Sequence, residues 1–479
     1  MSAKRKRTSA FAIIVTLALA IGLLAGCGEQ TSSASGGQDA PDVSPAADAQ
    51  NSDAQNLDTQ TPASRAPRDA EQGTDAQPVE ITFWYAGGKT AVGVLAEIVE
   101  EFNVSQNRWR VTSVTQADYT ETYQKLQAGI AGGAAPSLCL LDPTSSMSLA
   151  GKGLLENLKP LMDADASFDG SDYIEVFTAP CELPDGVVFA LPAYGTTQIL
   201  YYNIAAFDKA GIDPESIKTW QDLEAAARKM TVKEGGETVF YGWEPMWGVV
   251  NLIDASLSNG AKIFSDDGKT VLINSPEWVE VWDSFRKWIH EDEIMTIHYG
   301  GQGWEYWYKT IDDVLQDKAG GYTGSSGDQA DLDFDLVAAL EQPGWGGNPS
   351  APLAEALVLA VPANDDDAVT QGAYEFMKYF TSPESQAKWS MATGYVAVRK
   401  STAETPEFKA YAEQNPQALV PMSQAMHGSA YTVDPTGGQV LYALNVACDK
   451  VEIENIPAKE ALDEAQAAAQ AALDEVLNG

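Results

Sequence analysis

The sequence has little positive charge and few histidines, and each scarcity excludes a class of protein. Its 479 residues include 30 Lys and Arg against 68 Asp and Glu, a formal net charge of −38. Nucleic acids are bound by clustered Lys and Arg, so nucleic acid is excluded as a partner. His290, His298 and His427 match neither the HExxH nor the zinc-finger spacing. We interpret them as surface or packing residues and expect no metal and no cofactor.

The four cysteines are too few and too far apart for a disulfide or zinc framework. Cys139, Cys181 and Cys448 allow one disulfide and one free thiol, or three buried thiols. Cys139 stands inside an apolar run and is expected to pack in the core. The sequence leaves the choice between the two arrangements open.

Common enzyme motifs are also missing. There is no GxSxG elbow. Gly88-Lys89-Thr90 resembles the end of a P-loop, but Phe83 replaces the first glycine of the phosphate cradle. Asp alternates between residues 331 and 335 as in a calcium loop, but Leu336 stands where the turn glycine belongs. A secreted glycosidase is the enzymatic alternative that stays open, because an acid-rich chain can supply paired carboxylates.

Residues 1–26 are predicted to form a lipoprotein signal peptide. Positive residues from Lys4 to Arg7 precede an uncharged run from Ser9 to Ala25, which is short for a membrane span. The run ends in Leu24-Ala25-Gly26-Cys27, which resembles the bacterial lipobox. The alternative is an uncleaved anchor helix with an incidental cysteine. We expect a lipidated Cys27 that holds the protein on the outer face of the cell membrane.

Residues 27–77 are predicted to be a disordered acidic linker. The segment from Gly28 to Gln77 has no aromatic residue and is rich in Ser, Ala, Gln, Asp, Gly and Pro, so it cannot offset the entropy of ordering. Of the net charge of −38, +4 belongs to the signal peptide and −7 to the linker, which leaves −35 for the body from Pro78 onward. Two acyl chains suffice for stable anchoring.

The body begins with alternating strand and helix patterns. Strands are expected at 79–84, 109–114 and 137–141, and helices at about 92–102 and 119–131. This order is typical of a parallel sheet with covered faces. Ligands of such sheets lie beyond the carboxyl ends of the strands, so Trp84, Tyr85 and Asp142 are placed on the ligand side.

The remaining pattern continues the alternation. It predicts a strand at Ile199–Asn203, a Gly-rich turn at 320–327, an apolar run at 353–361 and helices at 220–229, 276–291, 304–315, 369–380 and after Pro457. The aromatic stripe of the helix at 276–291 is interpreted as core.

A set of short segments adds a family resemblance. The segments are Phe83-Trp84, Phe102-Asn103, Tyr123–Ile130, Ala135-Pro136, Leu200–Asn203, Lys218–Leu223, Gly324–Gly327 and Thr393–Val398. In this order the chain resembles the extracellular solute-binding proteins (family 1) of ABC importers, in the carbohydrate and glycerol-phosphate branch. The resemblance covers Val79 to Leu477. It implies an α/β, two-lobed periplasmic-binding-protein-like fold of type II, each lobe a mainly parallel sheet flanked by helices.

The resemblance also implies how the chain divides and what it does. Lobe 1 would contain 78–190 and about 318–357, and lobe 2 about 191–317 and 358–479, with crossings near Leu191–Thr197, Gly320 and Val361. The lobes would close on a solute by a hinge motion. The expected partners are a sugar and the transmembrane subunits of an ABC permease, and the protein is expected to be a monomer. A surface receptor that reports to a sensor kinase is a further alternative.

Sugar sites combine aromatic platforms with polar hydrogen-bonding groups, and the sequence offers candidates for both. Trp243 and Trp247 flank Pro245 in a loop-like segment, and the relatives place a similar Trp pair in the cleft. A Trp buried beneath a loop is the alternative. Tyr85 and Trp345 are candidates by location only.

The resemblance supplies the other candidates. Residues on or next to ligand positions of the relatives are Tyr119, Asp142, Thr196, Ser326 and Gly327. The Gly-rich turn at 320–327 would also open backbone N–H groups to a ligand oxygen. Glu355 stands where relatives carry small residues, so it is either a hydroxyl acceptor or a surface residue.

One departure from the relatives concerns phosphate. Glycerol-phosphate binders place an Arg near the segment that corresponds to Ser429–Gly437, and this segment has none. Without that bidentate partner, a phosphate would be buried unpaired. A neutral sugar or oligosaccharide is therefore favoured over the alternative of glycerol-3-phosphate or a glycerophosphodiester.

Overall fold

The computed structural model describes residues 77–478 apart from 184, 302–304 and 433. The predicted signal peptide, Cys27 and the linker up to residue 76 lie outside the described residues. None of the helices in the described ranges has the length and apolar character needed to cross a bilayer.

The first three strands form a parallel sheet, as predicted. Strand β1 (Val79–Tyr85) pairs in parallel with both β2 (Trp109–Thr115) and β3 (Leu138–Leu141). Helices α1 (Lys89–Ser105) and α2 (Tyr119–Gly132) connect them. Alternate residues of β1 are buried, which is the pattern that predicted this strand. The expected strand and helix order of this region is confirmed.

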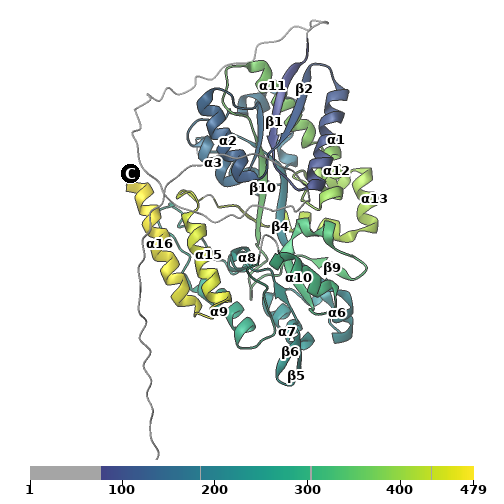
Figure 1. The fold of residues 1–479 in the computed structure, drawn as a ribbon, viewed down its shortest axis with the longest axis vertical. Helices are drawn as coiled ribbons and strands as arrows, with labels where there is room; N and C mark the ends of the chain where they lie inside the picture. The colour runs from purple at the N-terminus through teal and green to yellow at the C-terminus, as the bar shows by residue number, and fades with distance from the viewer. Residues whose placement is uncertain (1–76, 184, 302–304, 433, 479) are drawn as a thin grey trace, which may run out of the picture. The chain divides into compact units, whose positions relative to one another are not determined.

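Two long strands connect this sheet to the rest of the fold (Figure 1). Strand β10 (Leu353–Ala360) pairs antiparallel with β3 and with the first part of β4 (Leu191–Asn203). The second part of β4 pairs antiparallel with β8 (Gly321–Ser325) and β9 (Val337–Leu340), and β7 (Glu244–Pro245) is parallel to β8. The pairing beyond β3 is therefore mixed rather than mainly parallel, because the two connecting strands run in opposite directions.

The predicted Gly-rich turn at 320–327 is wrong in its backbone form. Residues Gly321–Ser325 form strand β8, and Ser326–Asp331 form the short 3-10 helix η4. The glycines provide space: a Cβ on Gly321 would lie 2.2 Å from the Trp243 ring, and one on Gly324 would lie 2.4 Å from the Tyr322 ring. From sequence alone, a strand whose glycines make room for neighbouring side chains cannot be distinguished from a glycine-rich turn.

Two large hydrophobic cores support the strands. The first core packs β1 and β3 against α1, α11 (Asp367–Phe380) and α12 (Pro383–Thr393). The second core is built by α7 (Trp220–Met230), α8 (Val249–Ser258), α9 (Pro276–His290), α15 (Gln439–Glu452) and α16 (Ala458–Asn478). The division into lobes at the expected boundaries stays a prediction. In the first core, Ala373 and Phe376 pack with Ile81 and Phe83. The prediction places the first two residues in lobe 2 (358–479) and the last two in lobe 1 (78–190).

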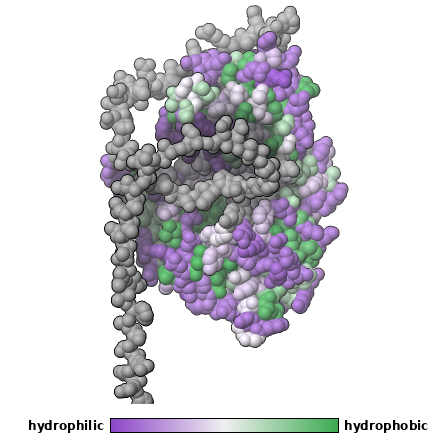
Figure 2. Space-filling view, in the orientation of Figure 1, coloured by the Kyte–Doolittle hydropathy of each residue, from purple (hydrophilic) through white to green (hydrophobic). Residues whose placement is uncertain are grey.

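The other elements are short. They are α3 (Pro143–Ala150), α4 (Lys159–Ala164), η1 (Gly170–Asp172), α5 (Glu175–Thr178), η2 (Ala179–Cys181), α6 (Ile204–Ala210), η3 (Pro214–Ser216), β5 (Val232–Glu234), β6 (Glu237–Phe240), α10 (Glu305–Leu315), η5 (Lys400–Glu404), α13 (Pro406–Gln414), η6 (Pro416–Leu419), α14 (Val420–Ala425) and β11 (Ser429–Ala430). Cys139, Cys181 and Cys448 are buried free thiols, the second of the two arrangements that the sequence allowed. Hydrophilic residues cover most of the described surface on the side shown in Figure 2.

Candidate functional site

A pocket lies where β4 and β10 run side by side. Thr196 of β4 and Glu355 of β10 are directly paired, so their side chains share one face of the sheet. Both residues line a pocket of about 240 Å³. Burial, and then the charge of Asp142, raises the pKa of Glu355 to about 7. Glu355 is half-buried in this lining rather than freely exposed, and its role as a hydroxyl acceptor stays a prediction.

The lining of this pocket divides into an apolar wall and a polar rim. The wall consists of Val250, Ile253, Ile263, Phe264, Leu353, Val440, Leu441 and Leu444, and the rim of Thr196, Thr197, Gln198, Glu355, Tyr431, Thr432 and Asp434. None of these lining residues is Lys or Arg. The combination suits a ligand with C–H faces and hydroxyl groups, whereas an anionic ligand would find no cation in the lining.

Asp142 adds a second carboxylate near Glu355. Its side chain accepts a hydrogen bond from the Ser145 N–H at 2.9 Å and caps the first turn of α3. On the same helix, Thr144 Oγ1 lies 3.0 Å from the Tyr431 hydroxyl. The charge of Asp142 contributes to the raised pKa values of Glu355 and Tyr431. Asp142 and Thr144 therefore lie next to the rim residues Glu355 and Tyr431 and add acceptor oxygens beside them.

A group of tyrosines extends from this rim. The Tyr119 hydroxyl lies 3.3 Å from that of Tyr194, and the Tyr194 ring centroid lies 4.9 Å from that of Tyr395. Burial and the charge of Tyr119 raise the pKa of Tyr395 to about 12. Gly327 lies against Tyr395, because a Cβ on Gly327 would be 3.2 Å from the ring. The predicted residues Tyr119 and Gly327 are thus connected through two tyrosines.

Hydroxyl groups of β8 and η4 meet Thr196 from the other side. Thr196 Oγ1 lies 3.3 Å from Ser325 Oγ and 3.4 Å from Ser326 Oγ. Ser326 is fully buried. Next to it, Asp328 accepts hydrogen bonds from Trp307 Nε1 at 3.0 Å and from the Tyr322 hydroxyl at 3.3 Å. The structure therefore brings Tyr119, Asp142, Thr196, Ser326, Gly327 and Glu355 into one connected region.

Trp247 belongs to an aromatic row on the second-core side. It is half-buried, and its Nε1 donates to Asp449 at 3.0 Å. Its ring packs edge-on against Tyr306 with 4.9 Å between the ring centroids, and the ring centroids of Tyr306 and Trp307 are 6.2 Å apart. Because Trp307 donates to Asp328, the row leads to η4. Trp247 therefore stays a candidate platform.

Two of the predicted aromatic platforms are core residues instead. Trp243 is fully buried in the second core, and its Nε1 donates to Thr323 Oγ1 at 3.0 Å. Trp345 is 2% exposed, donates to Glu280 Oε1 at 3.1 Å and packs 5.9 Å from Trp288. Neither ring presents a face to a solute, so these two predictions are withdrawn. The alternative of a Trp buried beneath a loop describes Trp243.

Tyr85 is also placed away from the pocket. It is 4% exposed in the first core, stacks 5.5 Å from Phe83 and accepts a hydrogen bond from Thr115 Oγ1 at 3.1 Å. It is the last residue of β1, and its hydroxyl group faces β2. The structure gives it no contact with the lining of the pocket.

The sequence analysis missed several residues of this region. They are Tyr431, Tyr395, Trp307 and Asp434. Tyr395 lies in a segment that carries the family resemblance, and the segment around Tyr431 was considered only for its missing Arg. Both are aromatic residues in segments that the family resemblance already singled out, and this could have identified them as candidates.

A larger hollow of about 860 Å³ lies elsewhere, lined by residues 332–335, by β9 and by residues 414–417 at the junction of α13 and η6. It contains none of the residues that the sequence marked as ligand candidates. The pocket at β4 and β10 is therefore the stronger candidate site.

Comparisons with known proteins agree with this fold. A sequence model of the family described as bacterial extracellular solute-binding protein matches residues 97–416. The sn-glycerol-3-phosphate-binding periplasmic protein UgpB of Yersinia pestis is 26% identical over 371 residues, 73% of this chain and 80% of that protein. UgpB of Rhizobium meliloti is 26% identical over 416 residues, covering 82% and 94%.

Solved structures show the same fold at lower identity. The cyclic alpha-maltosyl-1,6-maltose binding protein of Arthrobacter globiformis superposes with a TM-score of 0.70 at 21% identity, over 83% of this chain and all of that one. UgpB of Mycobacterium tuberculosis in complex with glycerophosphocholine also gives 0.70, at 20% identity, over 84% of this chain and all of that one.

Proposed function

Because the chain belongs to the family of bacterial extracellular solute-binding proteins, we propose that it captures a neutral sugar or oligosaccharide and delivers it to an ABC importer. The observation that carries the choice of ligand is the pocket at β4 and β10. Its apolar wall suits the C–H face of a sugar, and its rim of Thr196, Glu355 and Tyr431 suits hydroxyl groups. Maltose-type and cycloalternan-binding proteins among the structural neighbours support a carbohydrate ligand.

Charge around the pocket supports a neutral ligand. Glu355 and Asp434 stand at the rim, the charge of Asp142 acts on Glu355 and Tyr431 from next to it, and the lining has no Lys or Arg. A phosphate would need bidentate or multiple cationic donors to be bound in this environment. Glycerol-3-phosphate or a glycerophosphodiester is the second candidate, because the relatives at 26% identity are glycerol-3-phosphate-binding proteins.

The proposed mechanism uses the two connecting strands. β4 and β10 both run between the first-core side and the second-core side, so a small change of backbone angles in them would move the two sides relative to each other. A solute shifts such an equilibrium only by its difference in affinity for the two states. A solute that contacts both sides would supply that difference. Glu355 and Tyr431 would contact it from one side, and Trp247 from the other.

Membrane attachment belongs to the same proposal. The family acts outside the cytoplasm, and the lipobox-like segment ending at Cys27 would hold the protein on the outer face of the membrane. The acidic linker would then let the monomeric body reach the permease. Metabolic labelling with a palmitate analogue tests this part: Cys27→Ser should lose the label and be released from the membrane.

The ligand is identified by a thermal-melt screen of the full-length chain against sugars, glycerol phosphates, polyamines and short peptides. A ligand at 100 times its dissociation constant stabilises the folded state by about 2.7 kcal/mol. A sugar that stabilises the protein and is recovered unchanged supports the proposal. Stabilisation by phosphates alone supports the second candidate, and release of a cleaved product would instead support a secreted glycosidase with no transport role.

Glu355→Ala is expected to weaken sugar binding by about 10 to 100-fold, because it removes a half-buried, charged hydrogen-bond acceptor worth about 1.5–3 kcal/mol. Isothermal titration with the sugar found in the screen measures the loss. Glu237→Gln removes one carboxylate from the exposed hairpin β5–β6 and should leave the affinity unchanged. Equal affinity of the Glu355→Ala variant and the wild type would show that the sugar binds elsewhere.

Trp247→Ala is expected to reduce sugar affinity by about fivefold or more, because an aromatic platform contributes about 1 kcal/mol beyond its buried area. The same titration measures it. Tyr308→Ala is a matched control, since Tyr308 is an aromatic residue of α10 that is 54% exposed. If Trp247→Ala binds like the control, Trp247 is no part of the site.

A further inference from the structure

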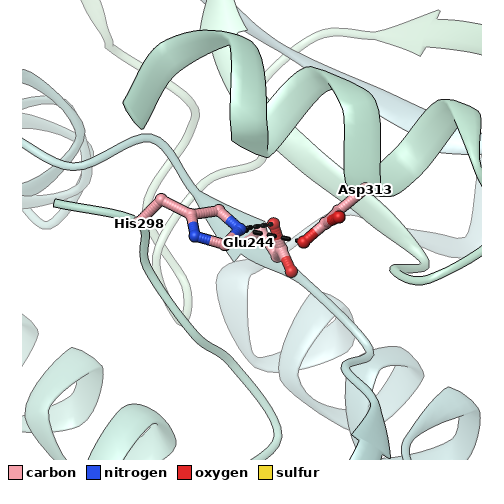
Figure 3. A group of neighbouring side chains, drawn as sticks. All are labelled: Glu244, His298 and Asp313. Carbon is pink, nitrogen blue, oxygen red and sulfur yellow. Dashed lines mark hydrogen bonds and ion pairs between the residues drawn. The ribbon is translucent and has the colours of Figure 1, made fainter. Parts of the chain in front are cut away.

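Three side chains that sequence spacing did not connect meet beside the second core. Glu244 lies on β7, His298 in the segment after α9, and Asp313 on α10, and all three point toward one another (Figure 3). His298 Nε2 lies 2.8 Å from Asp313 Oδ2 and 3.7 Å from Glu244 Oε2. One ligating atom from each residue falls within 4.8 Å of the other two. None of the three lines the proposed solute pocket.

Glu244 is the member of this group that its surroundings do not explain. Its side chain is 2% exposed, and among the described residues its Oε2 has no hydrogen-bond partner. Lys318 is the nearby lysine, but its Nζ lies 3.1 Å from Asp313 Oδ1, on the other carboxylate. A buried carboxylate without a paired cation is costly. The oxygen that lacks a partner is directed at the imidazole and the second carboxylate.

The backbone holds the three residues in place independently of one another. Glu244 pairs with Tyr322 in the β7–β8 ladder. Met295 forms a β-bridge with Trp243, and the Thr296 N–H donates to the Trp243 carbonyl, which fixes the segment leading to His298. Asp313 lies in the last turns of α10. The site is therefore preorganised by three separate segments.

We propose that Glu244, His298 and Asp313 bind a divalent transition-metal ion of the Zn²⁺ type. Bonds of about 2.1 Å in tetrahedral geometry place ligand atoms about 3.4 Å apart, between the two separations seen here. An imidazole nitrogen with two carboxylates suits Zn²⁺, whereas Ca²⁺ and Mg²⁺ prefer six or more oxygen ligands. Water would supply the fourth ligand.

The ion would connect β7, the segment of His298 and α10. α10 also carries Tyr306 and Trp307 of the aromatic row, so the ion would fix the position of one wall near the solute site without contacting the solute. The role is structural and goes beyond solute binding. Metal binding and sugar binding can therefore be measured separately, and either can fail alone.

The test uses the full-length chain stripped of metal with a chelator. Equilibrium dialysis against Zn²⁺ should find one tightly bound ion per chain, and Co²⁺ in its place should give the visible absorption of a tetrahedral site. Glu244→Gln and His298→Gln should each weaken binding by at least about tenfold, the lower end of what even outer-shell changes cost. His427→Gln is the matched control, because His427 faces a single carboxylate, Glu341, at the exposed surface.

A folding control accompanies the binding assay. Without metal, Glu244→Gln should melt at or above the temperature of the wild type, because it removes a buried carboxylate whose Oε2 has no hydrogen-bond partner among the described residues. With Zn²⁺, the wild type should gain stability and Glu244→Gln should not. The proposal is overturned if the wild type binds Zn²⁺ no better than the Glu244→Gln variant, or if His427→Gln loses binding as strongly as His298→Gln.

Discussion

Trp243→Ala is expected to lower the free energy of unfolding by about 3–5 kcal/mol, the usual cost of replacing a buried Trp by Ala. The indole is fully buried in the second core, its ring covers Gly321, and its Nε1 donates to Thr323. The substitution would leave a cavity between β8 and the helices of the second core. It would also leave the Thr323 hydroxyl without its donor.

Urea unfolding followed by circular dichroism measures this loss. Trp247→Ala is the comparison, because Trp247 lies four residues along the chain but is only half-buried, so its stability cost should be clearly smaller. For sugar affinity the order is reversed. Trp247→Ala should weaken sugar binding, whereas Trp243→Ala should leave the affinity of the folded protein unchanged. A stability loss below about 1 kcal/mol for Trp243→Ala would contradict its place in the core.

These two tryptophans show where sequence reasoning stopped. Both stand in the same Gly- and Pro-containing segment, and composition alone favoured a loop with two exposed rings. The contact that separates them joins Trp243 to Thr323, 80 positions along the chain. Only the pairing of β7 with β8 brings these residues together, and a two-residue strand such as Glu244-Pro245 has too few residues for a recognisable alternation.

The regular elements were more accessible from the sequence. β1 follows from alternation, because alternate residues of it are buried, and β3 follows from a continuous apolar run, because all four of its residues are buried. Strand β8 was missed because its glycines are explained by close contacts with aromatic side chains, not by a turn in the backbone. The antiparallel direction of β4 and β10 was likewise not visible, since it depends on which strands become neighbours.

The candidate site divides in the same way. Asp142 directly follows β3 and precedes a proline, so its position in the fold was available from a local signal, whereas its contact with a ligand stays a prediction. Thr196 and Glu355 were separate candidates, and their direct pairing is known only from the register of β4 and β10. Tyr431 lies near Thr144 through a contact that spans 287 positions, which no local pattern contains.

Stability is expected to fall as the pH rises from about 5 to 8, because several carboxyl groups are buried in the fold. Burial raises the pKa of Asp254 to about 7 even though Gln342 and the Leu353 N–H donate to it. Burial likewise raises the pKa of Asp328 and of Glu452 to about 8. Among the described residues, Glu452 Oε1 has no hydrogen-bond partner.

The direction follows from proton binding. These groups titrate near pH 4 in the unfolded chain but near pH 7 to 8 in the folded one, so between these values the folded state holds more protons. Their contribution to stability is complete below about pH 4 and is lost as the pH rises through the folded pKa values. Since one pKa unit corresponds to about 1.4 kcal/mol, we expect a combined loss of at least about 3 kcal/mol between pH 5 and 8.

Urea unfolding at several pH values checks this prediction, and the variants identify the groups. Glu452→Gln and Asp254→Asn keep the side-chain shape but cannot ionise, so each should flatten the decline and raise stability at pH 8 relative to the wild type. Glu237→Gln changes an exposed residue of the hairpin β5–β6, outside the buried carboxyl groups, and should leave the slope unchanged. If Glu452→Gln follows the wild-type curve throughout, Glu452 is not held protonated by its burial, and a cation or water must satisfy its carboxylate instead.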